Sequence, residues 1–204
     1  MLINKNIDGK TYKAFISYAV QKSDAFMLVL KYCDAQIFDS KEHLRNSISL
    51  LPTFTPDEDT INRLTAMENK SRQDLHLFQS ECLEFVNRLS RYLHHSRCNA
   101  VWPSTIAFPR TPNDYSINVY NMFSGAEQYL LQPQSYLGWR YPRYPEDLSF
   151  FKNNYCWAYA SSHEEYIEII PEDYEEYIRL KEMGIEFQDE YNPAEKKDMF
   201  YEAY

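Results

Sequence analysis

The sequence predicts an α+β fold, in which a small, mainly antiparallel sheet carries about four helices packed on it. Hydrophobic residues make up 44% and aromatic residues 16% of the 204 residues, enough for a packed core. Helical and strand-like segments follow one another without regular βαβ alternation, which argues against a parallel sheet. We expect one domain over residues 1–188 and an acidic C-terminal tail over residues 189–204.

Two elements are predicted near the N-terminus. Apolar side chains recur at helical spacing over residues 10–22, which predicts a first helix. Residues 25–32, with the sequence AFMLVLKY, have the length and composition of a buried strand. Residues 36–54 fit no single element, and a strand at residues 47–51 is one alternative.

A helix start follows at residues 55–58. Thr55 can cap this helix, Pro56 suits its first turn and Glu58 completes a capping box. We predict a weakly helical segment as far as Met67 and then a polar loop over residues 68–73.

The clearest helical periodicity lies in residues 80–95, where Cys82, Phe85 and Leu89 share one face. Cations gather toward the end of this predicted helix, where they oppose its dipole: Arg88, Arg91, His94, His95 and Arg97. An anion site on the arginines and a zinc site from Cys98 with the two histidines are alternatives. A second close pair of zinc ligands is lacking, so we expect no metal.

The middle of the chain is predicted to be rich in loops between Pro103 and Pro112. Residues 115–123 alternate as a strand does, and residues 125–132 predict a short helix that Pro133 ends. Two prolines exclude a helix at residues 139–145, for which we expect an extended surface crossing.

The C-terminal part begins with residues 145–151, which suit a helical turn. The runs 155–161 and 166–170 predict two strands joined as a hairpin. Pro171 then opens a helix that Gly184 ends, and residues 185–187 form a final short strand. The tail from Asp189 is predicted either to be mobile or to dock as a helix around residues 194–201.

Composition excludes several functions. The chain has only four glycines, and they are too far apart to form either the glycine-rich dinucleotide-binding motif or a P-loop. We therefore expect no cofactor. Signal-peptide and membrane-spanning runs are lacking, so we expect a cytoplasmic protein that does not enter membranes.

Charge is distributed unevenly along the chain. From Glu146 to the end there are 16 acidic and 5 basic residues, a balance of −11, whereas residues 1–145 hold 14 acidic and 16 basic residues, a balance of +2. An acidic region repels nucleic acid and favours basic partners. A solvated surface without a partner is the alternative interpretation.

His163-Glu164-Glu165 is the sharpest catalytic candidate, because a histidine can act as a general base and His163 and Glu165 could share one face of a strand. A solvated turn is the alternative. For binding a protein partner we select an aromatic and arginine-rich segment and an acidic segment, comprising Trp139, Arg140, Tyr141, Arg143, Tyr144, Glu172, Asp173, Glu175 and Glu176.

Four sequence elements resemble a pattern found in small uncharacterised soluble proteins of Gram-positive-type bacteria. They are Trp102-Pro103-Ser104-Thr105, the run from Pro145 to Phe151, Trp157, and His163-Glu164. The resemblance covers about the C-terminal half and implies no mechanism. It implies that these positions form one structural unit, in which Trp157 packs the hairpin and His163 bonds to the turn at Pro145–Leu148.

These observations favour a soluble protein-binding module with a basic protein partner. An immunity-type or anti-defence inhibitor fits, because inhibitors of nucleases imitate phosphate charge. A small hydrolase or transferase using His163 with a nearby carboxylate is the second hypothesis, and a structural subunit of an oligomer is the third.

Overall fold

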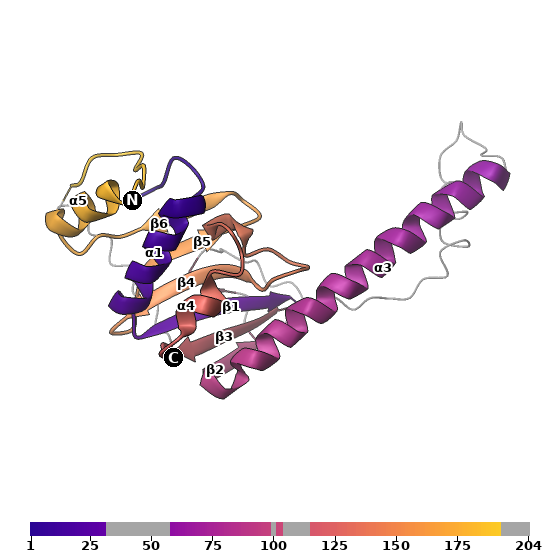
Figure 1. Cartoon of the computed structure of the whole chain (residues 1–204), viewed down its shortest axis with the longest axis horizontal. Coiled ribbons are helices and arrows are strands. Elements are labelled where there is room, and N and C mark those ends of the chain that lie inside the picture. Colours follow the sequence, from indigo (N-terminus) through magenta and orange to yellow (C-terminus); the bar gives the residue numbers. More distant parts are fainter. Residues whose placement is uncertain (32–57, 99–100, 104–114, 193–204) are drawn as a thin grey trace.

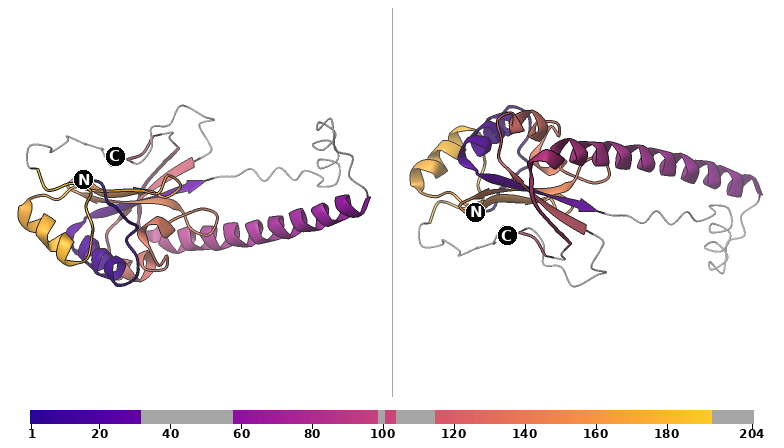
Figure 2. Two further views of the ribbon diagram at one scale, coloured as in Figure 1. Left: turned by 90° about the horizontal axis from the view of Figure 1, so that it is seen from above. Right: turned by 90° about the horizontal axis from the view of Figure 1, so that it is seen from below.

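A computed structural model describes residues 1–31, 58–98, 101–103 and 115–192. Its centre is a six-stranded sheet with the described helices on one side (Figures 1 and 2). In chain order the elements, with η marking a 3-10 helix, are α1 (Gly9–Lys22), β1 (Ala25–Lys31), α3 (Glu58–Leu89), η1 (Ser90–Tyr92), β2 (Leu93–Cys98), β3 (Tyr115–Asn121), α4 (Ala126–Leu130), η2 (Tyr136–Gly138), β4 (Glu146–Lys152), β5 (Tyr155–Ser161), β6 (Tyr166–Ile169) and α5 (Tyr174–Glu182). The predicted α+β class is confirmed.

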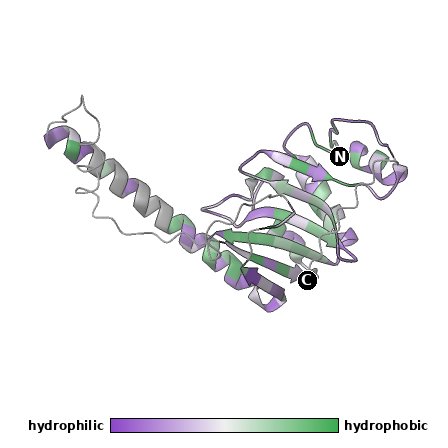
Figure 3. Ribbon diagram, turned by 180° about the vertical axis from the view of Figure 1, so that it is seen from behind, coloured by the Kyte–Doolittle hydropathy of each residue, from purple (hydrophilic) through white to green (hydrophobic). Residues whose placement is uncertain are grey.

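The strand order is β2-β3-β1-β4-β5-β6, and every pair is antiparallel. Strand β1 is central, and its alternate side chains enter two separate apolar clusters. Phe26 and Leu28 pack with the helices, whereas Met27 and Val29 belong to the cluster that contains Trp102. Both faces of β1 are therefore buried, which explains its unbroken apolar sequence (Figure 3).

Helix α1 packs on the sheet through the face that its periodicity predicts, with Tyr12, Phe15, Ile16 and Ala19 buried. Helix α5 ends before Gly184, whose φ is +95°. A Cβ atom at Gly184 would lie 2.8 Å from Thr11 Oγ1, so glycine is needed both for the backbone conformation and for the approach to α1.

The β6 edge of the sheet is covered by the N-terminus. Leu2 bridges to Glu168, and the backbone N–H of Ile3 donates to Ile167 O at 3.1 Å. The predicted short strand near residue 187 is a single bridge between Ile3 and Phe187. The N-terminal residues thus satisfy backbone groups that an edge strand would otherwise expose.

Helix α3 differs from the prediction, because it runs without a break where residues 68–73 were expected to form a loop. Residues 58–98 contain neither glycine nor proline, and the polar run includes good helix formers, so polarity alone did not interrupt the helix. At about 1.5 Å per residue, its 32 residues span about 48 Å, and its first part projects beyond the sheet (Figure 1).

The predicted end of this helix at residue 95 is also wrong. Helix α3 ends at Leu89, and residues 93–98 form strand β2, which pairs with β3. Leu93 is 39% exposed, so it does not extend the buried helical face. Pairing with β3, a tertiary interaction, overrides the local helical pattern here.

The predicted helical turn at residues 145–151 is wrong as well, because Glu146–Lys152 is strand β4, between β1 and β5. Residues 146–151 are all buried, which hides the alternation that would reveal a strand. Residues 139–145, which precede β4, are not helical, and this part of the prediction is confirmed. Residues 141–144 form a turn, however, and not the predicted extended crossing of the surface.

Other predicted elements agree with the structure. Strands β3, β5 and β6 and the short helix α4 lie where they were expected. Predictions for residues 36–54, the Pro109–Pro112 passage and the tail helix at residues 194–201 lie outside the described residues. None of the helices in the described ranges has an apolar stretch long enough to cross a membrane.

Candidate functional site

Strands β1, β4 and β5 place a group of polar side chains at one end of the sheet. Because the three strands alternate in direction, the end of β1, the start of β4 and the end of β5 meet there. Glu146 and Asp147 come from β4, and His163 comes from the turn between β5 and β6. Ligand-type atoms of these three residues all lie within 4.8 Å of one another.

Asp147 is fully buried and hydrogen bonded through both carboxylate oxygens. Trp102 Nε1 donates to Oδ2 at 2.8 Å, and the backbone N–H of Ser162 donates to Oδ1 at 2.8 Å. The pairing of β1 with β4 shifts register between Met27 and Val29, and Asp147 has a φ of +57°. This bulge turns Asp147 out of the regular strand pattern.

Glu146 is 8% exposed and receives no hydrogen bond from the described residues. Burial raises the pKa of its carboxyl group, and the negative charge of Asp147 raises it further. The positive charges of Lys31, His163 and Arg140 act in the opposite direction but do not cancel the rise in pKa. Lys31 Nζ lies over the rings of Tyr115 and Tyr141, at 5.9 and 6.0 Å from their centroids.

His163 has a side chain that is 46% exposed, and its Nε2 is 4.0 Å from Glu164 Oε1. The predicted pairing with Glu165 is not present among the described contacts. Glu165 has a φ of +56° in the turn, so the strand alternation on which that prediction relied does not apply. The carboxylates near His163 are those of Glu146, Asp147 and Glu164.

Serine and cysteine side chains also border this site. The hydroxyls of Ser161 and Ser162 are buried and have no hydrogen-bond partner in the described parts of the chain. Burial and the charge of Glu146 raise the pKa of the Cys82 thiol to about 12. The thiol is therefore protonated at neutral pH and is not a nucleophile.

The aromatic and arginine-rich segment expected to bind a partner mainly makes contacts within the chain. Trp139 is fully buried, and its Nε1 donates to Tyr12 Oη at 3.0 Å, so it cannot contact a partner at the surface. Tyr144 packs on Trp139, and Tyr141 is hydrogen bonded to Gln79. Only the arginines of this segment are well exposed: Arg140 and Arg143.

Arg143 also belongs to the contact with α3. Its Nε donates to Glu81 Oε2 at 3.2 Å, and its guanidinium lies 4.6 Å from the ring centroid of Phe78. Residues 139–144 thus attach helix α3 to the core, so their aromatic and arginine side chains make contacts within the chain.

The acidic candidates divide into a buried residue and three exposed ones. Glu176 is 7% exposed, and its carboxylate contacts Lys22 Nζ and Tyr18 Oη. It is therefore unavailable to a partner. Asp173 caps α5 by accepting from the backbone N–H of Glu176 at 2.8 Å, and Glu172 pairs with Lys152 at 3.3 Å.

Tyr174 is a surface residue that the sequence reasoning missed. It is 59% exposed at the first position of α5, between Asp173 and Glu175. Its ring lies 5.9 Å from that of Tyr177 and 5.8 Å from that of Tyr191. With 18 tyrosines in the chain, composition could not distinguish this exposed ring from buried ones such as Tyr136.

Fold and site together define an α+β protein with a polar cluster at one end of its sheet and an exposed acidic helix. Comparisons with protein-family models, curated proteins and solved structures found no match.

Proposed function

We propose that the chain is a protein-binding module that recognises a basic protein through the exposed residues at the start of α5. We call this surface the α5 face and define it as Glu172, Asp173, Tyr174 and Glu175. The observation that carries the proposal is the exposed Tyr174 ring within a group of carboxylates. Aromatic anchors of this kind dominate the binding energy of protein interfaces.

The α5 face is suited to binding because its anchor is already ordered. The rings of Tyr177 and Tyr191 support Tyr174, so little side-chain entropy is lost when a partner covers it. The part of the chain that carries the α5 face is strongly acidic in sequence, since residues 146–192 contain 13 acidic and 3 basic residues, a balance of −10. Such a surface accelerates association with a basic partner.

A finer form of the proposal is an immunity-type or anti-defence inhibitor in the cytoplasm. Proteins that act on nucleic acid carry basic surfaces that bind phosphate. An acidic helix with an aromatic anchor can occupy such a surface in place of nucleic acid. Binding of the α5 face would then inhibit the partner's activity, and added nucleic acid would compete.

Affinity capture from the native cell, followed by measurement on the purified pair, tests this proposal. The test variant combines Tyr174→Ala with Glu175→Lys. The matched control combines Leu77→Ala with Glu84→Lys on α3, where Leu77 is 57% exposed and Glu84 is also exposed. Both variants lose one exposed apolar side chain and change the charge equally.

We expect wild type and control to capture the same basic protein, and the α5 variant to bind it at least tenfold more weakly, because its anchor and one charge are lost. The affinity of the wild type should fall as salt rises. A partner that binds the α5 variant as tightly as wild type would refute the proposal. Light scattering that shows a stable oligomer covering α5 would favour the structural-subunit hypothesis instead.

A hydrolase or transferase using His163 is a second candidate function. The observation in its favour is that His163 is exposed and lies beside Glu146 and Asp147. A histidine near a carboxylate can act as a general base. A screen with model esters and phosphoesters tests it: activity should be lost in His163→Ala and kept in His95→Ala, and a screen without activity sensitive to His163 would exclude these reactions.

A further inference from the structure

We propose that Glu146, Asp147 and His163 form a binding site for a divalent transition-metal ion of the Zn²⁺ type. Their ligand atoms lie within 4.8 Å of one another. In tetrahedral coordination, two ligand atoms that each lie about 2.1 Å from one ion are about 3.4 Å apart. Closure of up to roughly 1.4 Å is therefore needed, and the exposed turn that carries His163 can supply it.

The carboxylate of Glu146 is an independent indication of a cation. It is 8% exposed, and none of the described residues donates a hydrogen bond to it. No ion pair joins it to Lys31 or Arg140 in the described parts of the chain, although both lie near enough to act on it electrostatically. A largely buried carboxylate beside a second carboxylate is unfavourable, and a bound cation compensates both charges.

The carboxylate of Asp147 is oriented by hydrogen bonds, as metal-ligating carboxylates usually are. Trp102 Nε1 and the backbone N–H of Ser162 each donate to one of its oxygens at 2.8 Å. Donors of this kind fix the orientation of a metal ligand. Trp102 and the β5–β6 turn therefore fix where Asp147 points.

The donor set indicates which ions fit. One imidazole nitrogen with two carboxylates suits Zn²⁺, Mn²⁺ or Fe²⁺, whereas Mg²⁺ and Ca²⁺ prefer oxygen ligands alone. Three protein ligands leave coordination positions for water or another ligand. The exposed side of His163 is the accessible side of the site.

Calorimetric titration of the full chain, after treatment with chelator, tests the inference with ZnCl₂ and MgCl₂ as probes. We expect one Zn²⁺ per chain with micromolar affinity or tighter, and Mg²⁺ at least tenfold weaker. His163→Ala and Glu146→Gln should each weaken Zn²⁺ binding at least tenfold.

Matched controls separate this site from other zinc-binding side chains. His95→Ala removes a histidine from β2, and Glu182→Gln removes an exposed carboxylate at the end of α5. Both should bind Zn²⁺ like wild type, and circular dichroism should show all variants folded. Wild type that binds no Zn²⁺, or Zn²⁺ binding that survives both His163→Ala and Glu146→Gln, would overturn the inference. The α5 face takes no part in this test, so the outcome is independent of the proposed protein-binding function.

Discussion

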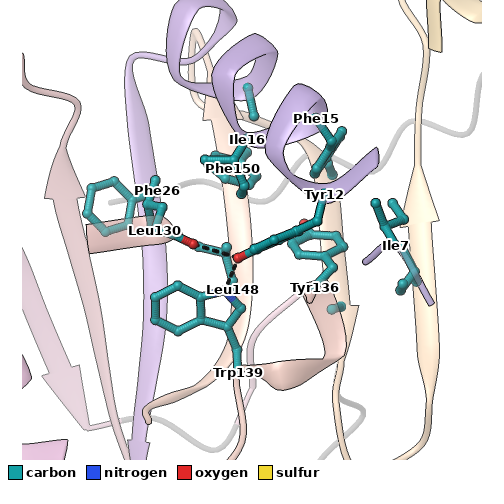
Figure 4. Packing of buried hydrophobic residues seen from close by; sticks show 14 of the residues in the cluster. Ile7, Tyr12, Phe15, Ile16, Phe26, Leu130, Tyr136, Trp139, Leu148 and Phe150 are labelled. Atoms are coloured by element: carbon teal, nitrogen blue, oxygen red, sulfur yellow. Dashed lines mark hydrogen bonds between the residues drawn. The ribbon is translucent and has the colours of Figure 1, made fainter. Parts of the chain in front are cut away.

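Replacing Tyr12 by phenylalanine removes one oxygen atom from the centre of the core. The Tyr12 hydroxyl donates to Leu130 O at 2.6 Å and accepts from Trp139 Nε1 at 3.0 Å, as Figure 4 shows. Tyr12 is 1% and Trp139 0% exposed, so water cannot replace the lost hydroxyl without a rearrangement. Tyr12→Phe therefore leaves one buried acceptor and one buried donor without a partner.

The cost of each unsatisfied buried group is about 1–3 kcal/mol. Because the two groups share a partner and can relax together, we expect Tyr12→Phe to lower the free energy of unfolding by about 2–4 kcal/mol. At about 3 °C per kcal/mol for a chain of this size, the melting temperature should fall by about 6–12 °C. Urea unfolding followed by tryptophan fluorescence measures the free energy, and calorimetry measures the temperature.

Tyr136 provides a matched control in the same core. It is also fully buried, its ring packs 5.2 Å from that of Phe15, and its hydroxyl has no hydrogen-bond partner within the described structure. Tyr136→Phe removes only this unsatisfied hydroxyl, so stability should be unchanged or rise by about 1 kcal/mol. Equal losses of stability in the two variants would refute the reasoning, because the hydrogen bonds would then not account for the difference.

Two further predictions concern buried charges. Lys22→Met leaves the Glu176 carboxylate without its cation, and each of the two side chains is 7% exposed, so unfolding by urea should show a loss of about 3 kcal/mol. Glu176→Gln should recover part of that loss in the double variant, and a loss below about 1 kcal/mol in Lys22→Met alone would contradict this account. For Glu168, burial raises the pKa, but hydrogen bonds from Tyr159, the terminal amino group and Tyr166 lower it overall. Because its pKa is lower in the folded chain than in the unfolded chain, Glu168 stabilises the fold above its ordinary pKa of 4.5, and this contribution is lost as the pH falls through the folded pKa. The stability difference between wild type and Glu168→Gln should therefore shrink from about pH 7 to about pH 3, and a difference that stays constant would show that ionisation of Glu168 is not involved.

Local sequence patterns predicted the elements that bury only one face or that end at a residue typical of a helix end. Helix α1 has a single buried face, and α5 ends before Gly184 as predicted, although it begins at Tyr174, after the capping Asp173, and not at Pro171. The predictions at α3 and β4 failed for opposite reasons. In α3, polar residues continue a helix that lacks breakers, and in β4, burial on both faces removes the alternation that marks a strand.

The candidate site was only partly predictable. His163 was recognised from its chemistry, but its expected partner Glu165 is replaced by Glu146 and Asp147, which lie far from it in the sequence. Hydrogen bonds connect Trp102 and Ser162 through Asp147, although these three residues lie in separate parts of the sequence. No local signal indicates that a bulge turns Asp147 toward the β5–β6 turn.

The sequence by itself determined the α+β class, the acidic C-terminal third and the lack of glycine-rich phosphate loops, because composition and local periodicity are enough for these properties. Tertiary structure decided which side chains are accessible and which meet. It buried Trp139 and Glu176, exposed Tyr174, and brought Glu146, Asp147 and His163 together. These outcomes depend on strand order and register, which arise from contacts between residues distant in the chain and leave no trace in any short stretch of sequence.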